Sequence, residues 1–75
     1  MQTELMQNGF LKIDGFKMAV WDEFAGAAGA FVAESYDGKT EAIAEPQPNG
    51  FLCWIVSTAD GSVIRSETIS QKGFL

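Results

Sequence analysis

Short apolar stretches alternate along this chain with turn dipeptides in which Asn or Asp precedes Gly. The five dipeptides are Asn8-Gly9, Asp14-Gly15, Asp37-Gly38, Asn49-Gly50 and Asp60-Gly61. Asn and Asp tolerate a positive φ and Gly favours one, which suits the tight turns of antiparallel hairpins. The pattern predicts an all-β fold, either a small antiparallel meander sheet or a partly open barrel of five to six short strands.

The first predicted hairpin turns at Asp14-Gly15. A two-residue turn would place Ile13 opposite Phe16 and Leu11 opposite Met18. One face would then be apolar and is expected to be core; it comprises Leu11, Ile13, Phe16, Met18 and Val20. The opposite face comprises Phe10, Lys12, Lys17, Ala19 and Trp21. Phe10 and Trp21 are therefore a candidate aromatic interface, unless a closed barrel or a second layer buries them.

The segment 51–56, FLCWIV, is apolar without interruption. It predicts a central strand that is covered on both faces, with Trp54 in the core. Its partner strand would follow the turn at Asp60-Gly61. A two-residue turn there would place Arg65 opposite Val56 and beside Trp54, within reach of a cation–π contact.

The middle of the chain allows two interpretations. Asp22 could cap a helix over residues 23–35, but Gly26 and Gly29 would each cost about 1 kcal/mol inside it. We favour a loop at AGAAG, residues 25–29, followed by a third hairpin of residues 30–36 and 39–45 around Asp37-Gly38. Pro46 and Pro48 would end this hairpin. The alternative is an α+β fold with one helix at about 23–35.

Length and composition predict one small globular domain over residues 1–75. Hydrophobic residues make up 47% of the chain, which is too many for a disordered acidic tail. A single cysteine cannot form an internal disulfide, so we expect a cytoplasmic protein. No apolar stretch approaches the roughly 18 residues of a membrane span, and no signal peptide is recognisable.

The chain lacks the residues from which most catalytic sites are built. It has no histidine, and so no Ser-His or Cys-His pair. Cys53 lies in an apolar segment and is expected to be a small buried side chain, not a reactive thiol. We therefore expect a protein that is not an enzyme, with no catalytic residues, cofactor or metal site.

The net charge of −5 is concentrated between residues 22 and 45, which hold six acidic residues and one base, Lys39. A localised field can steer a basic partner and hold it in register. We expect Glu34, Asp37, Glu41 and Glu45 to contact that partner, with Asp22 and Glu23 supporting them. Across the Asp37-Gly38 turn, Glu34 and Glu41 would lie directly opposite each other, where like charges repel.

The acidic surface predicts a non-enzymatic binding protein whose partner is a basic surface of another protein. The sharper hypothesis is an inhibitor that occupies the basic channel of a nucleic-acid-handling protein and competes with phosphates. In general composition the chain resembles the small acidic inhibitors that phages and mobile elements encode, such as anti-CRISPR proteins. Direct binding to nucleic acid is disfavoured by the charge. The alternative is a structural or self-assembling homo-oligomer that uses Phe10, Trp21 and a strand edge.

Overall fold

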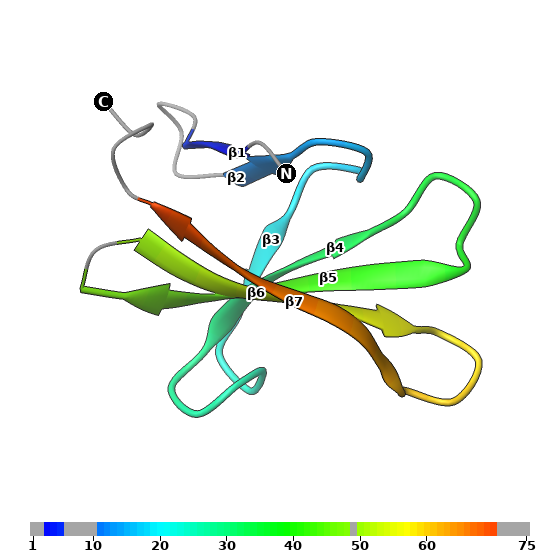
Figure 1. Cartoon of the computed structure of the whole chain (residues 1–75). Coiled ribbons are helices and arrows are strands. Elements are labelled where there is room, and N and C mark those ends of the chain that lie inside the picture. Colours follow the sequence, from blue (N-terminus) through cyan, green and yellow to red (C-terminus); the bar gives the residue numbers. More distant parts are fainter. Residues whose placement is uncertain (1–2, 6–10, 49, 71–75) are drawn as a thin grey trace.

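The computed structural model describes residues 3–5, 11–48 and 50–70, and all of its regular elements there are β-strands. Five strands form an open antiparallel sheet in the order β3-β4-β5-β6-β7, and two more form a separate antiparallel pair, β1-β2 (Figure 1). The strands are β1 Thr3–Leu5, β2 Leu11–Ile13, β3 Val20–Asp22, β4 Ala30–Glu34, β5 Thr40–Gln47, β6 Gly50–Ser57 and β7 Val63–Ser70. The predicted all-β meander is confirmed, and the alternative helix at 23–35 is wrong.

The core lies between the five-stranded sheet and the β1-β2 pair, which Figure 1 shows above the sheet. We call the sheet face toward this pair the inner face and the other the outer face. Small side chains on the inner face let β2 approach closely, and Leu11 and Ile13 of β2 are completely buried against them. The small residues are Ala33, Ala42, Ala44 and Cys53.

The hairpin at Asp14-Gly15 forms its predicted turn but not its predicted register. The Phe16 amide donates to the Ile13 carbonyl at 3.0 Å, yet Leu11 bridges Ala19 and not Met18. The reason is tertiary: the Lys17 amide donates to the Glu34 carbonyl at 2.9 Å, so the chain leaves β2 to follow β4. The one-residue shift exchanges the faces. Ala19 is buried, whereas Met18 and Val20, which were expected in the core, are 42% and 54% exposed.

The hairpin of β4 and β5 has the predicted register, with Glu34 opposite Glu41. Its loop is longer than two residues, because the last backbone pair joins the Ser35 amide to the Thr40 carbonyl at 2.9 Å. The β4-β5 hairpin ends before Pro46, as predicted, but the strand does not: β5 continues to Gln47 through its pairing with β6, where Pro46 lies opposite Phe51. The pairing of β4 with β5 ends at Ala44, so the missing amide of Pro46 interrupts no bond to β4.

β6 is a central strand, as predicted, and pairs with both β5 and β7. Its inner-face residues Phe51, Cys53 and Ile55 are buried, whereas Trp54 on the outer face is only half-buried. A bulge between Ile55 and Val56 shifts the pairing with β7. Arg65 lies opposite Ile55, and its predicted place opposite Val56 is wrong, because the turn is longer than two residues: the Ser57 amide already donates to the Ser62 carbonyl and Val56 pairs with Val63. The described residues include no helix that could cross a membrane.

Candidate binding surface

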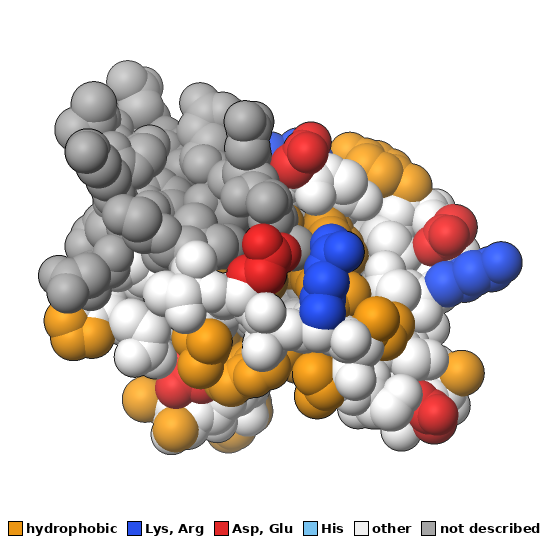
Figure 2. Space-filling model, viewed as in Figure 1, with side chains coloured by type: hydrophobic (Ala, Val, Ile, Leu, Met, Phe, Trp, Pro, Cys, Tyr) orange, Lys and Arg blue, Asp and Glu red, His pale blue; other side chains and the backbone are white. Residues whose placement is uncertain are grey.

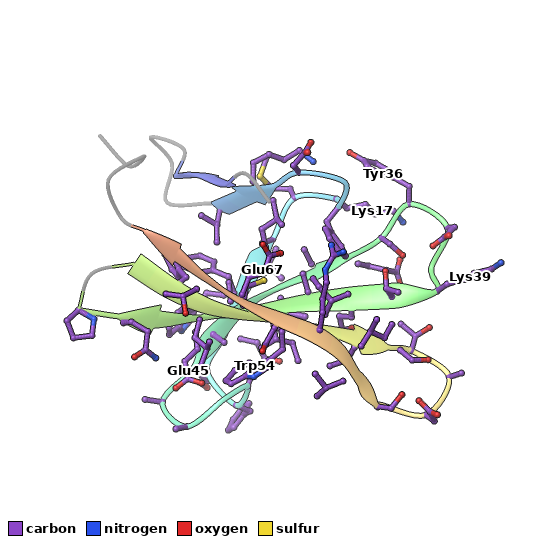
Figure 3. All side chains as sticks on the ribbon, viewed as in Figure 1. Lys17, Tyr36, Lys39, Glu45, Trp54 and Glu67 are labelled. Atoms are coloured by element: carbon purple, nitrogen blue, oxygen red, sulfur yellow. The ribbon has the colours of Figure 1, made fainter. Side chains whose placement is uncertain are left out.

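The outer face of the sheet carries a band of large apolar side chains, which we call the outer stripe. Val20, Val32, Ile43 and Trp54 are register partners across β3 to β6, and Leu52 and Val56 flank Trp54 on β6. All are half-buried except Val20, which is exposed. Figure 3 shows Trp54 and Glu45 on the side of the sheet away from β1-β2, and Figure 2 shows hydrophobic side chains gathered along that side.

Three acidic residues lie at the β4-β5 hairpin end of the outer stripe, and we call them the tip group: Glu34, Asp37 and Glu41. Glu34 and Glu41 are directly opposite each other, an arrangement that repulsion disfavours. Lys17 offsets it, because its Nζ lies 3.2 Å from Glu34 Oε1. Lys17 lies outside the acidic segment of the sequence, so counting charges along the chain did not reveal this contact.

Asp37 has a structural part in the hairpin loop. Its Oδ1 accepts hydrogen bonds from the Lys39 amide at 3.0 Å and the Ser35 hydroxyl at 2.7 Å. Both bonds favour the charged form of the carboxyl and so lower the pKa of Asp37, and the bond from the Lys39 amide has the larger effect. The positive charge of Lys39 acts in the same direction. With Lys17 and Lys39 beside three carboxylates, the tip group carries little net charge.

The other three acidic residues, Asp22, Glu23 and Glu45, lie at the opposite end of the stripe, and we call them the loop group. Asp22 Oδ1 accepts a hydrogen bond from the Phe24 amide at 2.9 Å, which starts the loop joining β3 to β4. That loop folds back against Glu45. The two are so close that a Cβ added at Gly26 would lie 3.0 Å from Glu45 Oε2. No hydrogen bond or ion pair recorded among the described residues joins the loop group to a lysine or arginine.

The acidic residues that were predicted to form one patch therefore fall into two groups, at the two ends of the outer stripe. On β5, Ile43 lies between Glu41 and Glu45, which are about 13 Å apart at the rise of a β-strand. Sequence reasoning missed the stripe. The feature of the sequence that could have revealed the stripe is the alternation of large residues, Val32 and Ile43, with the small alanines next to them that face the core.

Trp21 belongs to the inner face and not to the outer stripe, because it is the register partner of Phe31. Its ring packs edge-to-face on Phe31 at a centroid distance of 5.1 Å, and Phe31 in turn lies 6.0 Å from Phe51. Trp21 also covers the backbone of Gly29, where a Cβ would lie 2.4 Å from the indole. The ring remains 48% exposed. The other predicted aromatic interface residue, Phe10, lies outside the described residues.

The described residues provide little for catalysis. No three acidic or cysteine side chains among them lie close enough to hold a metal ion. Cys53 is buried, and the burial, followed by the negative charge of Glu67, raises its pKa to about 11, so the thiol stays protonated. A hollow of about 310 Å³ at the β5-β6 turn has no ionisable side chain in its described lining; it is formed by Gln47, Pro48, Gly50, Phe51, Leu52 and Thr68.

Comparison with protein-family models, curated proteins and solved structures found no match for the chain. A functional conclusion therefore depends on the geometry of the outer face.

Proposed function

We propose that the chain is a non-catalytic binding protein that docks the outer face of its sheet on another protein. The outer stripe would form the centre of the interface, and the tip group and loop group would form its charged rim. The observation that supports this most is the position of the stripe between the two carboxylate groups. An apolar centre with a polar rim is the usual anatomy of a protein–protein interface.

The two parts of the face would contribute differently. Exposed ion pairs contribute only about 0 to 1 kcal/mol each, so the carboxylates would mainly steer association and fix orientation. Burial of large apolar side chains would provide most of the affinity. The partner would therefore present an apolar ridge with lysine or arginine side chains at its ends.

The loop group is the stronger candidate for steering. Lys17 and Lys39 offset much of the tip group's charge, whereas Glu23 is exposed and Glu45 has no ion pair with any described residue. This ranking differs from the sequence prediction. There the main contacts to the partner were Glu34, Asp37, Glu41 and Glu45, and the supporting contacts were Asp22 and Glu23. Which carboxylates contact the partner stays a prediction.

The specific form of the proposal is inhibition of a nucleic-acid-handling protein. Such proteins carry basic grooves that hold phosphates, and they often combine these with apolar or aromatic surfaces. A face with carboxylates at both ends of an apolar band would match such a groove in charge and in polarity. Occupation of the groove would exclude the nucleic acid, with one inhibitor per site and no turnover.

The test is affinity capture with the immobilised chain, followed by titration of the purified partner. Val32→Thr with Ile43→Thr should weaken the complex at least tenfold, mainly through faster dissociation. Glu23→Gln with Glu45→Gln should slow association and flatten its salt dependence. Asp14→Asn is the matched control, because it removes one charge from a turn away from the outer face and keeps a turn-forming dipeptide.

A partner bound equally well by wild type and the stripe variant would contradict the proposed docking face. The inhibitor hypothesis is tested separately by measuring whether the captured partner loses its nucleic acid in proportion to the added chain. A partner that keeps its nucleic acid would contradict inhibition and leave the docking face in place.

A further inference from the structure

The outer edge of β7 is the second surface that suggests a partner. In the described part of the chain, β7 is the last strand of the sheet and pairs with β6 alone. It is eight residues long, and its ladder with β6 is regular from Arg65 to Ser70. Such an edge presents unpaired backbone amides and carbonyls that can accept another strand.

The sequence of β7 is self-complementary about Ser66. Arg65 and Glu67 flank Ser66 and lie on the same face, with Nε and Oε2 3.9 Å apart. One step further out, Thr68 pairs with Leu52 in the regular ladder, whereas Ile64 is the extra residue of the bulge. Figure 2 shows a basic and an acidic side chain close together in the middle of the side that faces the viewer, where Figure 1 shows β7. Figure 3 shows Glu67 on the side of β7 that faces β1-β2.

We infer that two copies of the chain pair through the outer edges of β7, antiparallel about a two-fold axis at Ser66. Symmetry limits the choices, because an antiparallel pair with a two-fold axis perpendicular to the sheet must be centred on a residue opposite its own copy. Centring on Arg65 opposes two guanidinium groups, and centring on Glu67 opposes two carboxylates. Centring on Ser66 places Arg65 of each copy opposite Glu67 of the other.

The distances allow each Arg65 a second carboxylate. Side chains directly opposite on neighbouring antiparallel strands have Cβ atoms about 4.5 to 5.5 Å apart, which is within reach of an arginine and a glutamate. Each Arg65 would therefore gain the Glu67 carboxylate of the second copy beside the one on its own strand, which lies 3.9 Å away. Both ion pairs would lie on the inner face of the joined sheet.

The two-fold axis also determines the shape of the dimer. It would join two five-stranded sheets into one continuous sheet, with both β1-β2 pairs on one side and both outer stripes on the other. The bulge at Ile64 leaves Arg65, Ser66 and Glu67 as the regular residues about this axis, so we expect a weak dimer that depends on concentration. This inference does not rest on the proposed function.

Charge exchange tests the register. Arg65→Glu and Glu67→Arg should each weaken self-association about tenfold or more, because each places like charges opposite each other twice. A mixture of the two variants should form a heterodimer, since every pair is then of opposite charge. The double variant Arg65→Glu/Glu67→Arg should self-associate as wild type does, and it serves as the control if a single variant fails to fold.

The measurement is sedimentation equilibrium over a concentration series, with circular dichroism to check folding. A monomeric wild type up to about 1 mM would overturn the inference. So would a dimer that survives both single substitutions, because it would use another surface such as the outer stripe. Loss of the dimer without recovery in the mixture or in the double variant would also overturn it.

Discussion

The two faces of the same sheet show opposite uses of apolar residues. On the inner face the middle strands carry mostly small side chains, and these are buried beneath β2. On the outer face the same strands carry Val32, Ile43 and Trp54, which are larger and only half-buried. An antiparallel sheet with one solvated face normally alternates apolar-in with polar-out. Here the alternation is small-in and large-out, and the proposal that the outer face is a contact surface rests on this difference.

The largest expected effect separates the faces by stability. Leu11→Ala should lower the free energy of unfolding by about 2 to 5 kcal/mol, because it leaves a cavity in the core of a small domain. Ile43→Ala should lower it by only about 1 kcal/mol, since its side chain is already partly in water. Urea denaturation with a common m-value measures both. Equal losses would mean that the outer stripe is as well packed as the core.

A second, smaller effect concerns the edge of the inner face, where Trp21 lies on Gly29. Gly29→Ala introduces a Cβ 2.4 Å from the indole at a residue whose φ is +97°, and it should cost about 1 to 3 kcal/mol or more. Gly15→Ala is the matched control, because its φ of +89° is similar and nothing lies within 4 Å of the added Cβ. The difference between the two unfolding free energies measures the contact with Trp21. No difference would mean that the indole moves aside freely.

The smallest effect is the pH dependence of the loops. Asp37 and Asp60 each accept hydrogen bonds from a backbone amide two residues later, and these bonds lower their pKa values below the ordinary 3.8. A lowered folded-state pKa gives stability that is present above pH 3.8 and is lost as the pH falls through the folded-state value. Asp37→Asn with Asp60→Asn should therefore flatten the acid limb of the stability curve. An unchanged limb would show that these carboxylates do not contribute.

The fold was largely predictable because turn chemistry is local. The dipeptide Asp37-Gly38 located its hairpin and even its register, since the longer loop keeps the same centre. Registers failed where distant residues intervene. The Lys17 amide bonds to the carbonyl of Glu34, which draws the chain away from β2. In the β6-β7 hairpin the turn is longer than two residues and a bulge follows it, and the dipeptide Asp60-Gly61 encodes neither.

The candidate site was only partly predictable for a related reason. The acidic residues are close in the sequence, but an extended strand separates Glu41 from Glu45 and places Ile43 between them. Charge counting along the chain also missed Lys17, which reaches the tip group from the segment before β3. Only the registers of β4 with β5 and of β5 with β6 could show that Val32, Ile43 and Trp54 form one row.

The central claim is that the outer stripe, which is only half-buried in the isolated chain, is covered by a partner, and thiol labelling tests this most directly. Ile43→Cys adds a thiol on the outer face one strand away from the buried Cys53, and mass spectrometry of fragments reports both sites in one protein. At low concentration the thiol at position 43 should react readily and become protected when the captured partner is added. Cys53 should react only as the chain unfolds, because burial keeps its thiol inaccessible and raises its pKa to about 11. Equal protection of both thiols in the isolated chain, or labelling at position 43 that the partner does not slow, would contradict this account.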